Sequence, residues 1–151
     1  TSPHGTSEGI FGEGITERLD LEAALDFLAS RHLGPVWLVG WSFGTELAIK
    51  YGFDKDIAGA VLLSPPLHRA SEADLAKWIG SNKKLVAIVP EHDEFLAPKE
   101  ARIRFSANPE AQVIAVDGAK HLWVGEVATK TVLNEIVKVV APESYPLPEQ
   151  F

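Results

Sequence analysis

The chain has 151 residues, of which 46% are hydrophobic and 23% charged, and its formal net charge is −7. This balance is typical of one globular domain, and acidic charge spread along the chain argues against nucleic acid or an anionic membrane surface as a partner. The absence of cysteine excludes disulfides and thiol chemistry, and no apolar run approaches the length that spans a bilayer.

In chain order, residues 1–14 carry four glycines and predict a loop, and residues 15–33 predict a helix that Gly34 and Pro35 end. Its helical spacing would turn Ile15, Leu19 and Phe27 toward the core and Glu17 toward solvent. Four apolar runs follow, at 36–39, 57–63, 85–89 and 113–116. The segments between and after them carry helical spacing or helix-start signals, namely 45–51, Ser71 with Asp74, Pro98, and 124–140. The alternation predicts one α/β domain over residues 1–151, with a mostly parallel sheet and helices on both faces.

The first apolar run leads into Gly40-Trp41-Ser42-Phe43-Gly44, where a strand becomes a helix. A sharp turn at this point would lift the serine side chain clear of the backbone, and we expect glycine at 40 and 44 to avoid clashes with the neighbouring strand and helix. Ser42 would lie at a helix N-terminus, where amide groups and the helix dipole favour negative charge. The stretch therefore indicates an exposed nucleophile, with an ordinary glycine-rich turn as the alternative.

A serine hydroxyl becomes a useful nucleophile when a base takes its proton, and the base needs an acid to orient it. Asp93 follows the third apolar run in PEHDEFLAP, and His121 follows the fourth in DGAKHLWVGE. Glu91 and Glu94 are rival acids, and each residue alone could be a solvated loop residue. The order of serine, acid and histidine at three strand ends favours a triad. Neighbouring residues of Glu91-His92-Asp93-Glu94 would point in alternating directions, so we predict no metal site there.

Together these motifs resemble the α/β-hydrolase superfamily, in particular its small capless bacterial serine esterases. The resemblance implies a triad of Ser42, Asp93 and His121, with the Phe43 backbone amide in the oxyanion hole, although Pro90 stands where the family's acid loop has glycine. It also implies a hydrolase that cleaves a carboxylic ester or related acyl substrate through an acyl-enzyme, without a cofactor. We expect a small, fairly apolar substrate. Candidates for lining its pocket, with core packing as the alternative, are Trp41, Leu67, Phe95, Leu96 and Trp123.

Family members place further strands and a second oxyanion donor ahead of the part that resembles residues 1–151. We therefore expect this chain to be the C-terminal two-thirds of a longer domain, with its own N-terminal segment as a partner. Three alternatives stay open: an acyltransferase on the same triad, a non-catalytic binding protein of the same fold, and one half of a split enzyme. We expect a soluble, cytoplasmic protein, although a signal peptide could precede Thr1 because the chain does not begin with methionine.

Overall fold

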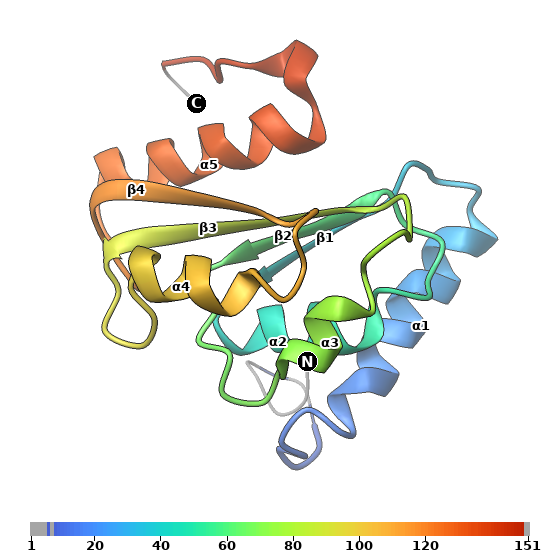
Figure 1. Ribbon diagram of the computed structural model, residues 1–151. Coiled ribbons are helices and arrows are strands. Elements are labelled where there is room, and N and C mark those ends of the chain that lie inside the picture. Colours follow the sequence, from blue (N-terminus) through green and yellow to red (C-terminus); the bar gives the residue numbers. More distant parts are fainter. Residues whose placement is uncertain (1–5, 7, 150–151) are drawn as a thin grey trace.

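The computed structural model describes residue 6 and residues 8–149 (Figure 1). Helices and strands alternate along the chain, as the sequence predicts. In order they are α1 (Glu17–Ser30), β1 (Trp37–Trp41), α2 (Phe43–Tyr51), β2 (Gly59–Leu63), α3 (Glu72–Ala76), β3 (Lys84–His92), α4 (Pro98–Phe105), β4 (Gln112–Lys120), α5 (Glu126–Val140) and a 3₁₀ turn at Pro142–Ser144.

The four strands form one parallel sheet in the order β1-β2-β3-β4, which confirms the predicted α/β class. Val39 pairs with Val61, and Val61 with Val86, so the first three strands lie in a continuous register. β3 and β4 extend further than the apolar runs that predicted them, to His92 and Lys120. Because all four strands are parallel, their carboxyl ends lie at the same edge of the sheet.

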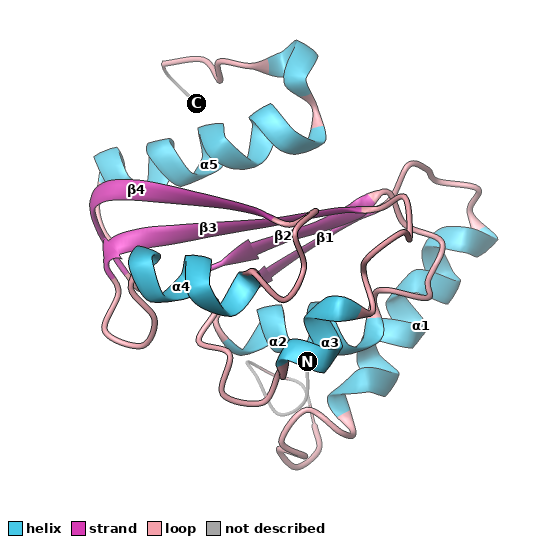
Figure 2. Ribbon diagram, in the orientation of Figure 1, coloured by secondary structure: helices cyan, strands magenta, loops and turns pink. Residues whose placement is uncertain are grey.

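Helices cover both faces of the sheet (Figure 2). On one side, α2, α3 and α4 pack on alternate strand residues such as Leu62 and Ala87, and Trp78 fills this cluster, with its indole N–H donating to the Ile49 carbonyl at 2.9 Å. On the other side, α5 packs on the residues between them, such as Val61. The predicted helix starts are confirmed, since Ser71 and Asp74 form a capping box and Pro98 opens α4. None of the helices in the described ranges is long and apolar enough to cross a membrane.

β1 lies at one edge of the described sheet (Figure 1). Val39 is therefore 50% exposed and Trp41 48% exposed, whereas all five residues of β2 are buried. Within residues 8–149, β1 therefore pairs with a strand on one side only, β2.

The prediction for the first helix was wrong in its orientation. Ile15, Leu19 and Phe27 are exposed, and Glu17 is buried with 1% exposure. The reason is local: the Glu17 carboxylate accepts hydrogen bonds from the backbone N–H groups of Gly12 at 2.6 Å and Gly14 at 2.8 Å. The hydrogen bond from Gly12 lowers the pKa of Glu17 despite its burial. This capture turns the helix so that Glu17 points inward and the predicted apolar stripe points out.

Candidate active site

Ser42 lies in a strained turn between the last residue of β1 and the first residue of α2. Its backbone has φ of 50° and ψ of −118°, a left-handed conformation that non-glycine residues rarely adopt. The Ser42 N–H donates to the Leu63 carbonyl at 2.9 Å, and the Thr45 hydroxyl donates to the Ser42 carbonyl at 2.6 Å. These contacts hold the turn so that the Ser42 side chain extends from the carboxyl edge of the sheet.

The two glycines of this turn are not equivalent. A Cβ atom at Gly40 would lie 2.6 Å from the Gly44 carbonyl oxygen, so only glycine fits there. A Cβ atom at Gly44 would meet no described atom within 4 Å. The expectation that Gly44 also avoids a clash was wrong with respect to the described residues, because its Cβ direction faces the open side of α2.

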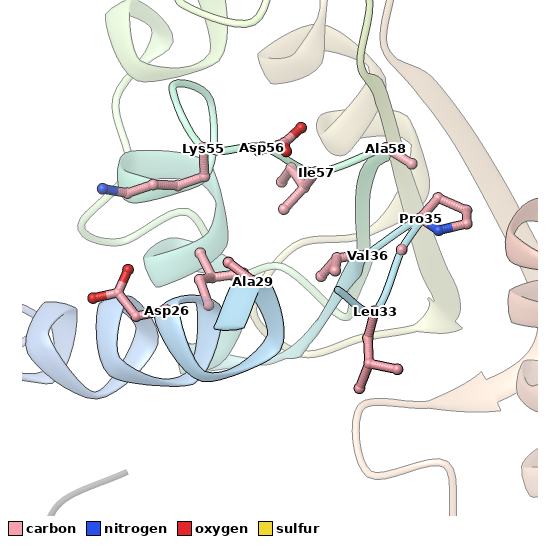
Figure 3. A pocket seen from close by; sticks show the side chains of 11 residues that line it. Asp26, Ala29, Leu33, Pro35, Val36, Lys55, Asp56, Ile57 and Ala58 are labelled. Carbon is pink, nitrogen blue, oxygen red and sulfur yellow. The ribbon is translucent and has the colours of Figure 1, made fainter. Parts of the chain in front are cut away.

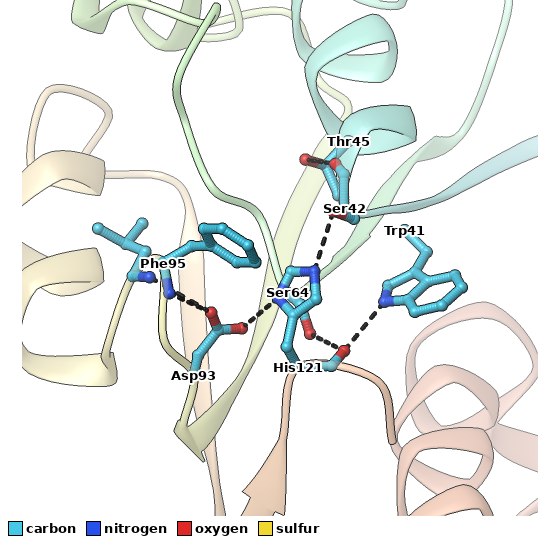
Figure 4. Close-up of polar contacts among 8 residues, drawn as sticks. Trp41, Ser42, Thr45, Ser64, Asp93, Phe95 and His121 are labelled. Carbon is cyan, nitrogen blue, oxygen red and sulfur yellow. Dashed lines mark hydrogen bonds and ion pairs between the residues drawn. The ribbon is translucent and has the colours of Figure 1, made fainter. Parts of the chain in front are cut away.

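The structure brings Ser42, His121 and Asp93 into one hydrogen-bonded chain (Figure 4). His121 Nε2 lies 2.9 Å from Ser42 Oγ, and His121 Nδ1 lies 2.9 Å from Asp93 Oδ2. Asp93 Oδ1 accepts the backbone N–H groups of Phe95 at 2.9 Å and Leu96 at 3.3 Å. Both carboxylate oxygens are thus bonded, and this orients the buried acid toward the imidazole.

The rival acids lie outside this chain of hydrogen bonds. Glu91 accepts the backbone N–H of Gly118 at 2.7 Å on the surface. Glu94 lines a pocket together with His121, but the carboxylate bonded to the imidazole is that of Asp93. Among the described residues, no group of three or more metal-ligating side chains is placed to hold an ion.

Aromatic residues surround the imidazole of His121. The Phe95 ring meets it edge-on at 4.6 Å between centroids, and the Phe95 side chain is 48% exposed. His68 meets Phe95 edge-on at 5.7 Å. Trp41 lies on the other side, 6.3 Å from the imidazole centroid. Phe95 and Trp41 are therefore exposed beside the histidine.

The other three candidates for pocket lining lie in the core. Leu67 and Leu96 are each 3% exposed and pack in the cluster under α2, α3 and α4, and Trp123 is 6% exposed in the cluster under α5. These three residues therefore pack in the core, which was the alternative to pocket lining.

Two features of the site were missed in the sequence. Ser64, the first residue after β2, is buried, and its hydroxyl donates to the His121 carbonyl at 3.1 Å. Glu46, one turn after Ser42 on α2, is also buried; it accepts the Arg69 N–H at 2.6 Å, and its other oxygen lies 3.7 Å from the Arg69 guanidinium. The available signal for Ser64 was its place at a strand end, which it shares with Ser42, Asp93 and His121. Glu46 had no such signal, because a glutamate on a helix is normally solvated.

The pocket in Figure 3, of about 400 Å³, lies at the opposite end of the sheet, between the end of α1 and the start of β1. Its lining includes Asp26, Lys55 and Asp56, and it contains none of Ser42, Asp93 and His121. A second pocket, of about 420 Å³, is lined by His121 and Leu122. Ligands of open α/β sheets bind at the carboxyl ends of the strands, so we assign the site to the edge that carries Ser42 and His121.

A scan against models of known protein families finds no match, and neither does a search of the curated proteins. Solved structures do match. An α/β serine hydrolase homologue from Coxiella burnetii aligns over 80% of this chain and 58% of its own, with 21% identity and a TM-score of 0.69. A serine hydrolase without a lid from Xanthomonas campestris aligns over 78% and 53%, with 21% identity and a TM-score of 0.63.

The esterase Pf2001 of Pyrococcus furiosus aligns over 89% of this chain and 63% of its own, with 22% identity and a TM-score of 0.65. The chain thus spans somewhat more than half the length of these three structures. These likenesses, with the parallel sheet and its strand-to-helix turn, show that the chain has the α/β-hydrolase fold.

Proposed function

We propose that this chain carries the catalytic triad of a serine hydrolase that cleaves a carboxylic ester or a related acyl compound. The observation that supports the proposal most directly is the chain of two 2.9 Å contacts that links Ser42 Oγ, His121 and Asp93. The strained backbone of Ser42 supports it further, because strain of this kind collects at functional sites. The structural neighbours that are named as hydrolases or esterases point to the same reaction class.

The first half of the reaction forms an acyl-enzyme. His121 Nε2 takes the Ser42 hydroxyl proton as the oxygen attacks the carbonyl carbon of the substrate, which gives a tetrahedral oxyanion. Asp93 stays ionised and stabilises the imidazolium through Nδ1–H. The imidazolium then gives its proton to the leaving alcohol, the bond between carbon and leaving oxygen breaks, and the acyl group remains on Ser42.

The second half restores the serine. His121 takes a proton from water, the hydroxide attacks the acyl carbon, and collapse of the second tetrahedral species returns the proton to Ser42 Oγ as the acid leaves. One donor for both oxyanions is the backbone N–H of Phe43, the first residue of α2. N–H groups in the first turn of a helix have no partner within the helix, so this donor is free to face the oxyanion.

The substrate side of the proposal rests on the two half-exposed aromatic side chains beside His121, Trp41 and Phe95. Flat apolar walls of this kind favour a small, apolar acyl group. One helix of five residues, α3, lies between β2 and β3, which leaves little chain to form a lid over the site within the described residues.

A fluorophosphonate probe tests the proposal, because it phosphonylates only a serine that a base has activated. We expect the protein, as its gene encodes it, to gain the mass of one probe, and the Ser42→Ala variant to gain none. Asp93→Asn keeps the shape of the acid and disturbs the tautomer of His121, so it should slow labelling by about 10⁴-fold. A folded protein that takes up no probe would refute the hydrolase proposal and favour a binding role.

A further inference from the structure

We infer that Ser64 and Trp41 are positioning residues for His121. Both donate a hydrogen bond to the same acceptor, the His121 backbone carbonyl: the Ser64 hydroxyl at 3.1 Å and the Trp41 indole N–H at 3.1 Å (Figure 4). We call this pair of hydrogen bonds the carbonyl clamp. Its catalytic consequence rests on the proposed function, whereas its effect on the geometry of His121 does not.

His121 needs such support because it directly follows an irregular part of the sheet. β3 and β4 pair regularly as far as Pro90 opposite Val116, and the next pair is His92 opposite Lys120. One residue of β3 and three residues of β4 lie between these two pairs, so β4 bulges between Val116 and Lys120, just before His121. Leu122 follows His121 and is 59% exposed, so on this side the first residue that packs in the core is Trp123.

The clamp restrains the histidine from two directions. A carbonyl oxygen has two lone pairs, and the two donors occupy both, which fixes the plane of the peptide bond that follows His121. With this plane fixed, the imidazole starts from a defined backbone position and reaches Ser42 and Asp93 with a 2.9 Å contact at each ring nitrogen.

The donors are themselves well anchored. Ser64 is 1% exposed, and its own N–H donates to the Ile88 carbonyl of β3 at 3.0 Å. Its φ of 49° is left-handed, which a serine adopts only where its surroundings hold it. Trp41 directly precedes Ser42. One dipeptide therefore presents the nucleophile and holds the backbone of its base, and any shift at the end of β1 moves both together.

The test compares Ser64→Ala, Trp41→Phe and the double variant with two matched controls in the protein as its gene encodes it. Ser106→Ala also deletes a hydroxyl that donates to a backbone carbonyl, that of Ile103 at 2.6 Å, but on the exposed surface of the C-terminal end of α4. Trp37→Phe changes a tryptophan of the same strand that makes no hydrogen bond to His121 within the described residues. Melting temperatures of all five variants separate loss of folding from loss of positioning.

We expect each clamp variant to lower kcat for a simple ester by about fivefold, and the double variant by about 25-fold. Fivefold corresponds to about 1 kcal/mol at 1.36 kcal/mol per tenfold change, the usual net worth of one hydrogen bond. KM should stay unchanged in Ser64→Ala, because the buried Ser64 side chain cannot meet the substrate. Both controls should retain the parent kcat within twofold.

A second readout does not depend on turnover. A proton held between His121 Nδ1 and Asp93 exchanges slowly with water and gives a resolved downfield NMR signal. This signal should broaden or disappear in the double variant and persist in both controls. Wild-type kcat in both single variants, or an unchanged signal in the double variant, would overturn the clamp. A parent protein without esterase activity or probe labelling would instead overturn the proposed function, and the NMR comparison would still decide the clamp.

Discussion

Alanine at Gly40 and alanine at Gly44 should have opposite effects, although both positions belong to the same turn. A methyl group at Gly40 would lie 2.6 Å from the Gly44 carbonyl oxygen, 2.7 Å from its carbonyl carbon and 2.8 Å from the Thr45 nitrogen. Ordinary contacts of a Cβ atom begin at 3.4 Å, so the end of β1 and the start of α2 must separate by about 0.8 Å. All three obstructing atoms are backbone, which cannot rotate away.

The cost of this separation has two parts. Overpacking of this kind lowers the free energy of unfolding by about 1–3 kcal/mol. The displaced helix start also carries Ser42 away from His121, and a misplacement approaching 1 Å can reduce the rate by about 10²-fold. At Gly44, where no described atom lies within 4 Å, alanine in the first turn of α2 should instead raise the free energy of unfolding by about 0.4–1 kcal/mol.

Guanidinium unfolding of Gly40→Ala, Gly44→Ala and the parent protein measures the stability difference, and the rate of fluorophosphonate labelling measures the position of Ser42. The expected order of midpoints is Gly44→Ala above the parent, and Gly40→Ala below it. Equal midpoints for the two variants, or a lower midpoint for Gly44→Ala, would refute the packing argument for this turn.

Two predictions concern stability in acid. Hydrogen bonds from the backbone N–H groups of Gly12 and Gly14 hold the pKa of Glu17 below its usual value. The ionised carboxylate therefore stabilises the fold above the pKa that Glu17 has in the unfolded chain, and this stabilisation is lost as the pH falls through the lower pKa of the folded protein. In the Glu17→Gln variant, the denaturation midpoint should depend less on pH over this interval. Partial burial acts to raise the pKa of Asp74, but hydrogen bonds from Lys77 and Ser71 lower it from 3.8 to about 2, so stability present above pH 3.8 should be lost as the pH falls to about 2. The Asp74→Asn variant should have a lower denaturation midpoint than the parent at pH 7, and its midpoint should change less between pH 3.8 and about 2. If the midpoints of the variant and the parent fall equally over this interval, the assignment to Asp74 is wrong.

The fold could be predicted from the sequence because the patterns that indicate it extend over whole strands and helices. Continuous apolar strands that alternate with helical segments leave few arrangements other than a parallel sheet covered on both faces, and the buried strand β2 is the clearest case. The same reasoning predicted that Ser42, Asp93 and His121 would lie together, because ligands of such a sheet bind where strands end and each of these residues follows an apolar run; the structure brings their side chains into contact.

Orientation could not be predicted in the same way, because it depends on single contacts. Glu17 is on a helix of mixed composition, and only the two backbone N–H groups of the preceding loop decide that it points inward. Leu96 and Trp123 lie within three residues of Asp93 and His121 in the sequence, yet both pack into the core, as does Leu67 after β2. A residue close to a motif in the sequence has its backbone close to the site. Whether its side chain is buried depends on the direction in which that side chain points.

Ser64 shows why one half of the site was visible in the sequence and the other was not. Ser42 and Ser64 occupy equivalent places at the ends of neighbouring strands, with φ of 50° and 49°, and each donates its N–H to the next strand, at Leu63 and Ile88. Ser42 is followed directly by α2, whose first turn lies so close to Gly40 that only glycine fits at that position. Ser64 is followed by two prolines and an irregular loop, and the next helix begins only at Glu72, so no helix start approaches Leu62 as α2 approaches Gly40. The same strained geometry therefore presents one hydroxyl outward toward His121 Nε2 and turns the other inward to the carbonyl of that same histidine.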